Sequence, residues 1–290
     1  MMAFLIVKYL GIGIGKWSNL KEQLAFALPT IPSNVSSWVV DSSDKYVIGI
    51  LIGSVAVGCY SPGYALGSIL LMFLSPFAVL LPAVLPEHYE KGNIGEVDKY
   101  LSYSMKYYLL LTVPAAVGMS VLSKPLLYII TTPEIALGGY MVTPFVCLGA
   151  IFMGMYGITN NILILEKNTM ILGKLWIIVA ISNIVLNLLL VPYLNILGAA
   201  IATLLCYILA FAVTAFASNK TMRLPFNIKE LLKIVIASAI MGIIVYIMNP
   251  NGIINVLISI IVGVIVYFGI IFILKAVTMK EIAIFKDLIH

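Results

Sequence analysis

The chain has 290 residues, of which 62% are hydrophobic and only 10% are charged, and its mean hydropathy is +1.11. Because soluble domains carry about 25% charged residues, this composition excludes a soluble globular protein and predicts an integral membrane protein. The formal net charge of +5 comes from basic residues spread over short loops, so it does not indicate a nucleic-acid partner.

The first segment of the chain is apolar but short. Residues 1–14 are too few to cross a bilayer comfortably, and they lack the basic start and the small-residue cleavage site of a signal peptide. We therefore interpret residues 1–20 as the tail of a helix whose beginning lies outside this sequence.

Eight apolar runs of helical length follow, and many of them contain Gly or Pro. Such runs favour membrane-spanning helices over a β-barrel, so the predicted fold is an all-α, polytopic bundle of transmembrane helices. Turns are expected at 53–58 and 191–198, a short surface helix within 124–139, and bends at Pro76 and Pro82. The predicted spans are 22–51, 60–86, 96–122, 140–165, 169–191, 198–217, 231–248 and 253–274.

The basic residues predict how the bundle is oriented in the cell membrane. If the first span begins in the cytoplasm, all of the 17 Lys and Arg residues except Lys8, Lys45 and Lys124 lie on or near the cytoplasmic side. This asymmetry supports the helix order and predicts a cytoplasmic C-terminus. The external loops are short and carry few ionisable groups, so an enzyme acting at the outer face is not expected.

The most polar part of any predicted span is residues 33–50. Asn34, Ser37, Asp41, Asp44 and Lys45 follow one another at helical spacing and are expected to share one face. Asp41 and Lys45 also have the order that favours an intrahelical ion pair. Because ionisable groups at membrane depth usually face a bundle interior or a wet cavity, we interpret this face as the lining of a substrate or ion cavity. The alternative is a helix end at the outer membrane surface.

Other polar groups lie in the middle spans. The fourth span carries Asn160 and Asn161, and the fifth carries Asn183 and Asn187 on one face. They either bond neighbouring helices together or line a sugar pathway, and the sequence leaves both alternatives open. Tyrosines in the second and third spans are expected in an interfacial aromatic belt; they are Tyr60, Tyr64, Tyr103, Tyr107 and Tyr108.

Three stretches together carry a resemblance to a known family. They are LPTIPSNVSSWVVDSSDKYVIG, VGCYSPGYALGSILLMFLSPF and VPYLNILGAAIATLLCYILAF. Their order resembles that in the polysaccharide-unit flippases, the O-antigen flippase-like branch of the multidrug/oligosaccharidyl-lipid/polysaccharide (MOP) exporter superfamily. The resemblance implies a MATE-like fold of two six-helix lobes around a central cavity, often with two extra C-terminal helices. Residues 21–222 match the second lobe, and 223–290 match the extra helices and a cytoplasmic tail.

The resemblance also implies an activity. The expected cargo is an oligosaccharide linked to a polyprenyl or dolichyl phosphate, moved from the cytoplasmic to the outer leaflet by alternating access. Lys45 would supply a base for the phosphate, and acids would bind a coupling H⁺ or Na⁺. The first lobe is not in this sequence, so the chain is expected to be a fragment or to pair with a lobe from another chain.

Other functions remain open at this point. One is a drug or small-molecule exporter coupled to H⁺ or Na⁺, and another is a non-transporting remnant. A membrane-embedded transferase is disfavoured by the short external loops. The sequence has no Walker motif and no metal-ligand spacing, so no tightly bound cofactor and no metal are predicted.

Overall fold

The structure is a computed structural model that describes residues 30–219, 222 and 228–275, with side chains described from residue 35 onward. The predicted segment 1–20 lies outside the described residues. Within them the structure is helical throughout, which confirms the all-α prediction. The elements are α3 (Thr30–Leu51), α4 (Ser54–Ser68), the 3₁₀-helix η1 (Ile69–Leu74), α5 (Ser75–Glu90), α6 (Ile94–Ile130), α7 (Pro133–Gly139), α8 (Val142–Leu165), α9 (Thr169–Leu194), α10 (Ile196–Ser218), α11 (Ile228–Met248) and α12 (Ile253–Ile273).

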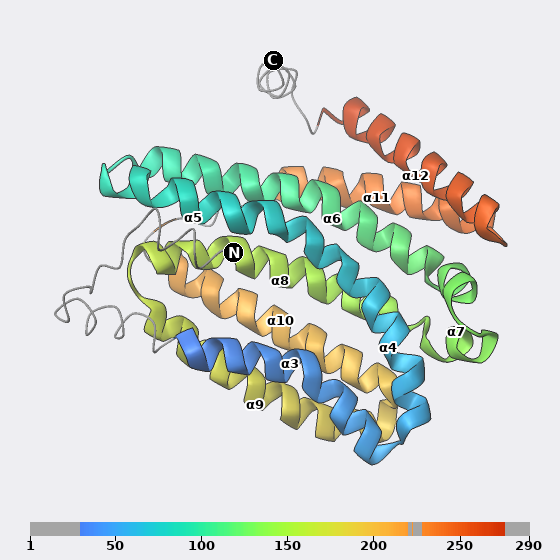
Figure 1. The fold of residues 1–290 in the computed structure, drawn as a ribbon. Coiled ribbons are helices and arrows are strands. Elements are labelled where there is room, and N and C mark those ends of the chain that lie inside the picture. Colours follow the sequence, from blue (N-terminus) through green and yellow to red (C-terminus); the bar gives the residue numbers. More distant parts are fainter. Residues whose placement is uncertain (1–29, 220–221, 223–227, 276–290) are drawn as a thin grey trace, which may run out of the picture.

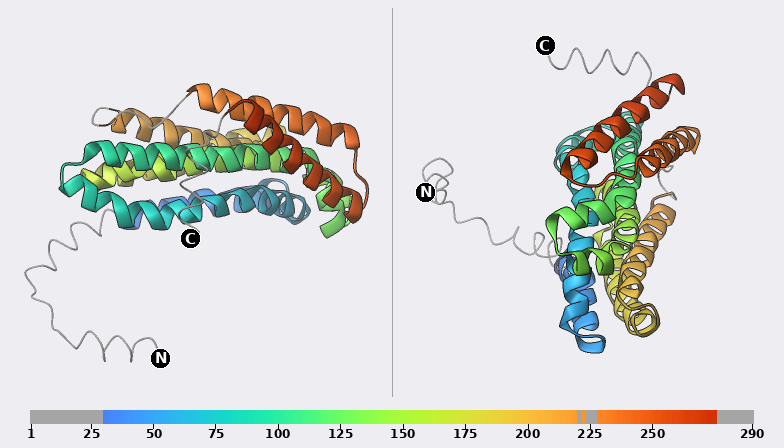
Figure 2. Two further views of the ribbon diagram at one scale, coloured as in Figure 1. Left: turned by 90° about the horizontal axis from the view of Figure 1, so that it is seen from above. Right: turned by 90° about the vertical axis from the view of Figure 1, so that its right-hand side faces the viewer.

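The helices form an elongated bundle with α8 in its middle (Figure 1). Helix α8 packs against α10, α6 and α4, and α9 packs against α3 and α10. Helix α11 lies along α6, and α12 leans on α11. The end-on view in Figure 2 places α11 and α12 at one end of the cross-section and α3 and α9 at the other.

Seven of the described spans are long and apolar enough to cross a membrane, counting α4, η1 and α5 as one span of 37 residues. The chain is therefore a multi-pass membrane protein. Helix α3 is not among the seven, because Asp41, Asp44 and Lys45 make it too charged. It nevertheless packs along α9 and also contacts α4 and α10 within the bundle. Protein contacts, rather than composition, keep α3 in its place.

The span from α4 to α5 changes winding in its middle. Six residues from Ile69 to Leu74 form a 3₁₀-helix, and Pro76 follows in the first turn of α5. Proline has no N–H to continue the helical bonding, and the Ser75 hydroxyl donates instead to the carbonyl oxygen of Met72 at 2.7 Å. The 3₁₀-helix ends just before Pro76, and Pro76 and Pro82 both lie within α5, so the bends expected at the two prolines remain predictions.

Several predicted boundaries are wrong. The turn expected at 53–58 is confined to Ile52 and Gly53, since α4 begins at Ser54. Gly53 has φ 120°, a conformation that L side chains rarely adopt. The turn expected at 191–198 is the single residue Asn195, at φ 53°, with Pro192 inside α9. The third span extends to Ile130, while the short helix expected before the fourth span is confirmed as α7.

Glycines let α4 lie close to α7 and α8. A Cβ atom at Gly63 would overlap the carbonyl oxygen of Gly139, and one at Gly67 would lie 2.7 Å from Cβ of Val146. Small residues of this kind allow membrane helices to approach closely. The close contact sets the position of α4 beside α3, and with it the position of Tyr60 and Tyr64.

Candidate functional site

Helix α3 presents two different polar environments. A buried stripe at fourfold spacing consists of Ser36, Val40, Asp44 and Ile48. Asp41 and Lys45 lie beside this stripe and are exposed. This corrects the prediction of one cavity-lining face, because Asp44 is 0% exposed and is surrounded by protein.

The Asp44 carboxylate accepts hydrogen bonds from three other helices. The Tyr60 hydroxyl of α4 donates to Oδ2 at 2.6 Å, and the Thr203 hydroxyl of α10 donates to the same oxygen at 2.7 Å. Asn187 Nδ2 of α9 donates to Oδ1 at 2.8 Å. Charge-assisted bonds of this kind are about twice as strong as neutral ones. They join α3, α4, α9 and α10 at one carboxylate.

A second layer of bonds holds these donors in place. Asn183 Oδ1 accepts from the Ser43 hydroxyl at 2.6 Å and from Asn187 Nδ2 at 3.1 Å. Asn183 Nδ2 lies 3.3 Å from the Thr203 hydroxyl. Of the two alternatives for Asn183 and Asn187, the contacts match interhelical bonding. We call Ser43, Asp44, Tyr60, Asn183, Asn187 and Thr203 the Asp44 cluster.

The six residues of the Asp44 cluster offer many oxygen acceptors, and none of them has a basic side chain. Oδ1 of Asn187 is buried and has no hydrogen-bond partner among the described residues. Together with the Asp44 carboxylate it offers hard oxygen ligands, which suit a hard cation such as Na⁺. No group of three or more His, Cys, Asp and Glu residues that could hold a metal occurs in the described part of the chain.

The exposed side of α3 is organised by two tyrosines. The Tyr207 hydroxyl of α10 donates to Oδ1 of Asp41 at 2.7 Å. The Lys45 ammonium lies over the ring of Tyr64 in α4, 5.5 Å from its centroid, within the range of a cation–π interaction. The predicted Asp41–Lys45 ion pair is not formed, since the ion pairs in the described ranges all involve other residues.

The remaining predicted site residues are not part of the Asp44 cluster. Ser37 is half-buried in α3, and the backbone of Asn34 belongs to α3 while its side chain lies outside the described part. Asn161 Nδ2 donates within α8, to the carbonyl oxygens of Gly157 at 3.0 Å and Ile158 at 3.1 Å. No hydrogen bond between described residues joins Asn160 or Asn161 to the Asp44 cluster.

Sequence reasoning missed Thr203 and Tyr207 and misplaced Tyr60. Tyr60 was expected in an interfacial belt but is 0% exposed and bonded to Asp44. Tyr108 is also buried, and its hydroxyl donates to the carbonyl oxygen of Ala150. Thr203 and Tyr207 are four apart on α10, a spacing that places them on one face and could have been noticed.

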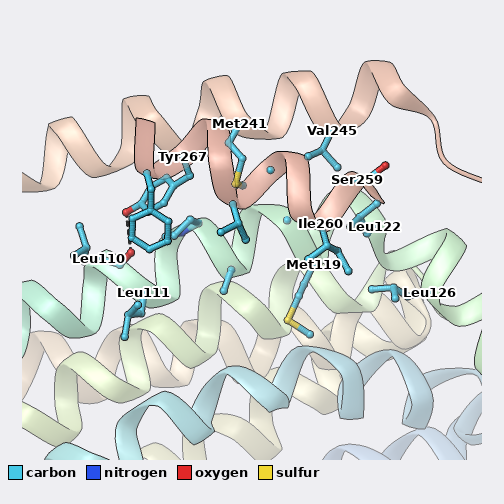
Figure 3. A pocket seen from close by; sticks show the side chains of 16 residues that line it. Leu110, Leu111, Met119, Leu122, Leu126, Met241, Val245, Ser259, Ile260 and Tyr267 are labelled. Atoms are coloured by element: carbon cyan, nitrogen blue, oxygen red, sulfur yellow. Dashed lines mark hydrogen bonds between the residues drawn. The ribbon is translucent and has the colours of Figure 1, made fainter. Parts of the chain in front are cut away.

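A second feature lies at the other end of the bundle. A cavity of about 330 Å³ opens between α6, α11 and α12, and Ser259 and Tyr267 are its polar lining residues. Met119 and Met241 are among its lining residues, and Figure 3 shows the Tyr267 hydroxyl donating to the carbonyl oxygen of Leu110, at 2.7 Å. Its lining carries no charge, so it suits apolar groups and not a phosphate or a sugar.

Comparison with known proteins identifies the family. A family model described as lipid II flippase MurJ matches residues 17–279. A protein of Haloferax volcanii named probable low-salt glycan biosynthesis flippase Agl15 is 22% identical over 279 residues, which are 94% of this chain and 58% of that protein. An uncharacterized membrane protein of Methanocaldococcus jannaschii is 31% identical over 228 residues, which are 74% of this chain and 43% of that protein.

A solved structure agrees with these relatives in fold. Lipid II flippase MurJ in an inward closed conformation has a TM-score of 0.70 and 24% identity, covering 100% of this chain and 60% of that one. The chain therefore spans roughly half of the length of the proteins that it matches. Flippases are transporters, in agreement with the prediction that the chain is not an enzyme. From the matched family model, we conclude that the chain belongs to the lipid II flippase MurJ family, within the MOP superfamily.

Proposed function

We propose that the chain is the second lobe of a flippase for a lipid-linked oligosaccharide. The cargo is a sugar on a polyprenyl or dolichyl phosphate of the kind that O-antigen-type flippases carry, moved from the cytoplasmic to the outer leaflet by alternating access. The first lobe is supplied by the rest of a longer protein or by another chain. Support comes from the family match and from the likeness to a Haloferax protein named a glycan flippase.

The observation that carries this proposal is the exposed ammonium of Lys45. Lys45 is exposed even though its ammonium lies over the ring of Tyr64 of α4, and no carboxylate of the described chain forms an ion pair with it. An unpaired cation at membrane depth is costly unless it has an anionic partner. A lipid phosphate is such a partner. Lysine presents a point charge to the phosphate, whereas arginine would form two parallel hydrogen bonds with it.

We place the coupling ion, Na⁺ or H⁺, at the Asp44 cluster. The Asp44 carboxylate and Oδ1 of Asn187 would hold Na⁺, or Asp44 would carry the proton. If Na⁺ binds there, it stabilises the folded chain, so the melting temperature of the purified protein should rise with NaCl relative to KCl at constant ionic strength. Asp44→Asn should lose the rise. An absent rise in the wild type would leave the proton as the coupling ion.

We further propose that the C-terminus is cytoplasmic, with α11 and α12 forming the two extra helices after a six-helix lobe of residues 21–222. The distribution of basic residues supports this orientation. Labelling of a cysteine added at the C-terminus in intact cells should fail with an impermeant maleimide and succeed after permeabilisation. Labelling in intact cells would show that the C-terminus lies outside the cell and would contradict the proposed orientation.

Binding by the purified full chain tests the proposed cargo. A fluorescent polyprenyl diphosphate oligosaccharide should bind to the wild type in nanodiscs, and Lys45→Ala should weaken binding at least about tenfold, since it removes the charge that meets the phosphate. The competing function, a small-molecule exporter, is probed with a lipophilic cation such as ethidium. If ethidium binds with higher affinity than the lipid, and if Lys45→Ala does not change its affinity, the exporter function would be favoured.

A further inference from the structure

The two charged residues on the exposed side of α3 stand in the order that normally forms an ion pair. Asp41 and Lys45 are four residues apart with the acid first, which is the stabilising arrangement on a helix. Both residues are exposed, on the same side of α3. An isolated α3 would therefore neutralise Lys45 with Asp41. The protein does not do this, and the reason lies in α4 and α10.

Asp41 is held by a residue of another helix. Tyr207 is buried, and its hydroxyl donates to Oδ1 of Asp41 at 2.7 Å. The ring of Tyr207 lies against Gly149 of α8, where an added Cβ would come within 3.2 Å of it. The packing of α8 and α10 thus fixes the hydroxyl, and the hydroxyl fixes the carboxylate.

Lys45 is held on the other side. Its ammonium lies over the ring of Tyr64, whose position follows from the close glycine contacts of α4. The adjacent acid, Asp44, already accepts three hydrogen bonds from Tyr60, Asn187 and Thr203. Both acids near Lys45 are therefore occupied by neutral donors, and the positive charge stays available on the exposed side of α3.

We propose that Tyr207 is a positioning residue that keeps Lys45 available for an anionic ligand by holding Asp41 away from it. The inference rests on the proposed function, in which Lys45 meets the phosphate of the cargo. Tyr207 would not contact the ligand itself, but it would determine whether the Lys45 ammonium is free to bind the ligand's phosphate. Without the Tyr207 hydroxyl, the Asp41 carboxylate loses its partner and pairs with Lys45, which lies one helical turn further along α3.

The test measures binding of farnesyl diphosphate to the purified full chain by isothermal titration calorimetry, with farnesol as the uncharged reference. Lys45→Gln should raise the dissociation constant about tenfold because the charge is lost. Tyr207→Phe should raise it about threefold to fivefold, the strength of an exposed ion pair that now competes for Lys45. Adding Asp41→Asn to Tyr207→Phe should restore it to about the wild-type value, because the competing carboxylate is gone.

Tyr267→Phe is the matched control, since it removes a buried tyrosine hydroxyl of α12, a helix at the opposite end of the bundle from α3 (Figure 2), and should not change binding. Melting temperatures of all variants show whether each protein is folded. Wild-type affinity in Tyr207→Phe, with weakened binding in Lys45→Gln, would overturn the positioning role and leave the proposed function standing. Failure of Asp41→Asn to rescue Tyr207→Phe would also overturn it. Wild-type affinity in Lys45→Gln would instead overturn the proposed anion site itself.

Discussion

The two ends of the bundle use polar groups in opposite ways. Around α3, α9 and α10, a buried carboxylate gathers hydroxyl and amide donors from three other helices. Around α6, α11 and α12, a cavity of about 330 Å³ is lined almost entirely by apolar side chains, and the Ser259 hydroxyl in its wall is buried without a partner in the described structure. Burying polar and ionisable groups in a membrane protein costs free energy. Function is therefore expected at the end around α3, α9 and α10, whereas packing dominates at the end around α6, α11 and α12.

The largest difference between the two ends should appear on removing the carboxylate. Asp44→Ala leaves the hydrogens of Tyr60, Asn187 and Thr203 without their acceptor, and should lower the free energy of unfolding by about 3–5 kcal/mol. Asp44→Asn keeps the shape and one acceptor and should cost clearly less. Denaturant unfolding in detergent measures both. Equal costs for the two variants would show that shape, and not bonding, determines the stability of this end.

A single hydroxyl of the Asp44 cluster should have a smaller effect. Thr203→Val preserves the side-chain shape but removes the donor to Asp44 and the acceptor for Asn183. We expect a loss of about 1–2 kcal/mol in the free energy of unfolding. Thr214→Val on the same helix is the control, because the Thr214 hydroxyl is buried with no partner among the described residues. A loss in the control as large as that of Thr203→Val would contradict the account.

At the end around α6, α11 and α12, the Tyr267 hydroxyl makes a hydrogen bond with the backbone. Tyr267→Phe removes the donor to the carbonyl oxygen of Leu110, and should destabilise the protein by about 1 kcal/mol or less. Chemical denaturation followed by tryptophan fluorescence is sensitive enough to detect this. A loss approaching that of Asp44→Ala would show that the two ends do not differ in the way described.

The smallest effect is expected for Ser259→Ala. The buried hydroxyl has no partner to lose, so its replacement by a methyl group should change the free energy of unfolding by less than about 0.5 kcal/mol, or stabilise slightly. Thermal unfolding against the wild type is the measurement. A clear destabilisation would reveal a bonding partner for Ser259 outside the described residues.

The sequence alone predicted the fold class and pointed to the unusual polar groups at one end of the bundle, but it predicted nothing about the apolar cavity at the other. Composition and apolar runs identified a helical membrane bundle, and helical spacing identified Asp41, Asp44, Lys45, Asn183 and Asn187 as unusual polar groups within it. These signals are local, since a span or a helix face is encoded within about twenty residues. Basic residues in the loops then supplied an orientation that remains a prediction.

The partners of those groups could not be predicted in the same way. Tyr60 and Thr203 contact Asp44 from 16 and 159 residues away, and the choice depends on how α4 and α10 pack. The exact turns were also missed, because Asn195 and Gly53 each reverse the chain with fewer residues than the flanking turn signals suggested. The partner of Asp41 is the hydroxyl of Tyr207, which lies 166 residues away in the sequence.

The central claim is that Lys45 carries a transport function and does not merely fill space at the surface of α3. It is tested most directly in the cell that makes this protein, by replacing the chromosomal codon to give Lys45→Ala and measuring surface glycan together with protein level. The account predicts that surface glycan is lost and that lipid-linked oligosaccharide accumulates, with the protein present at its normal level. Normal surface glycan in the variant would contradict it.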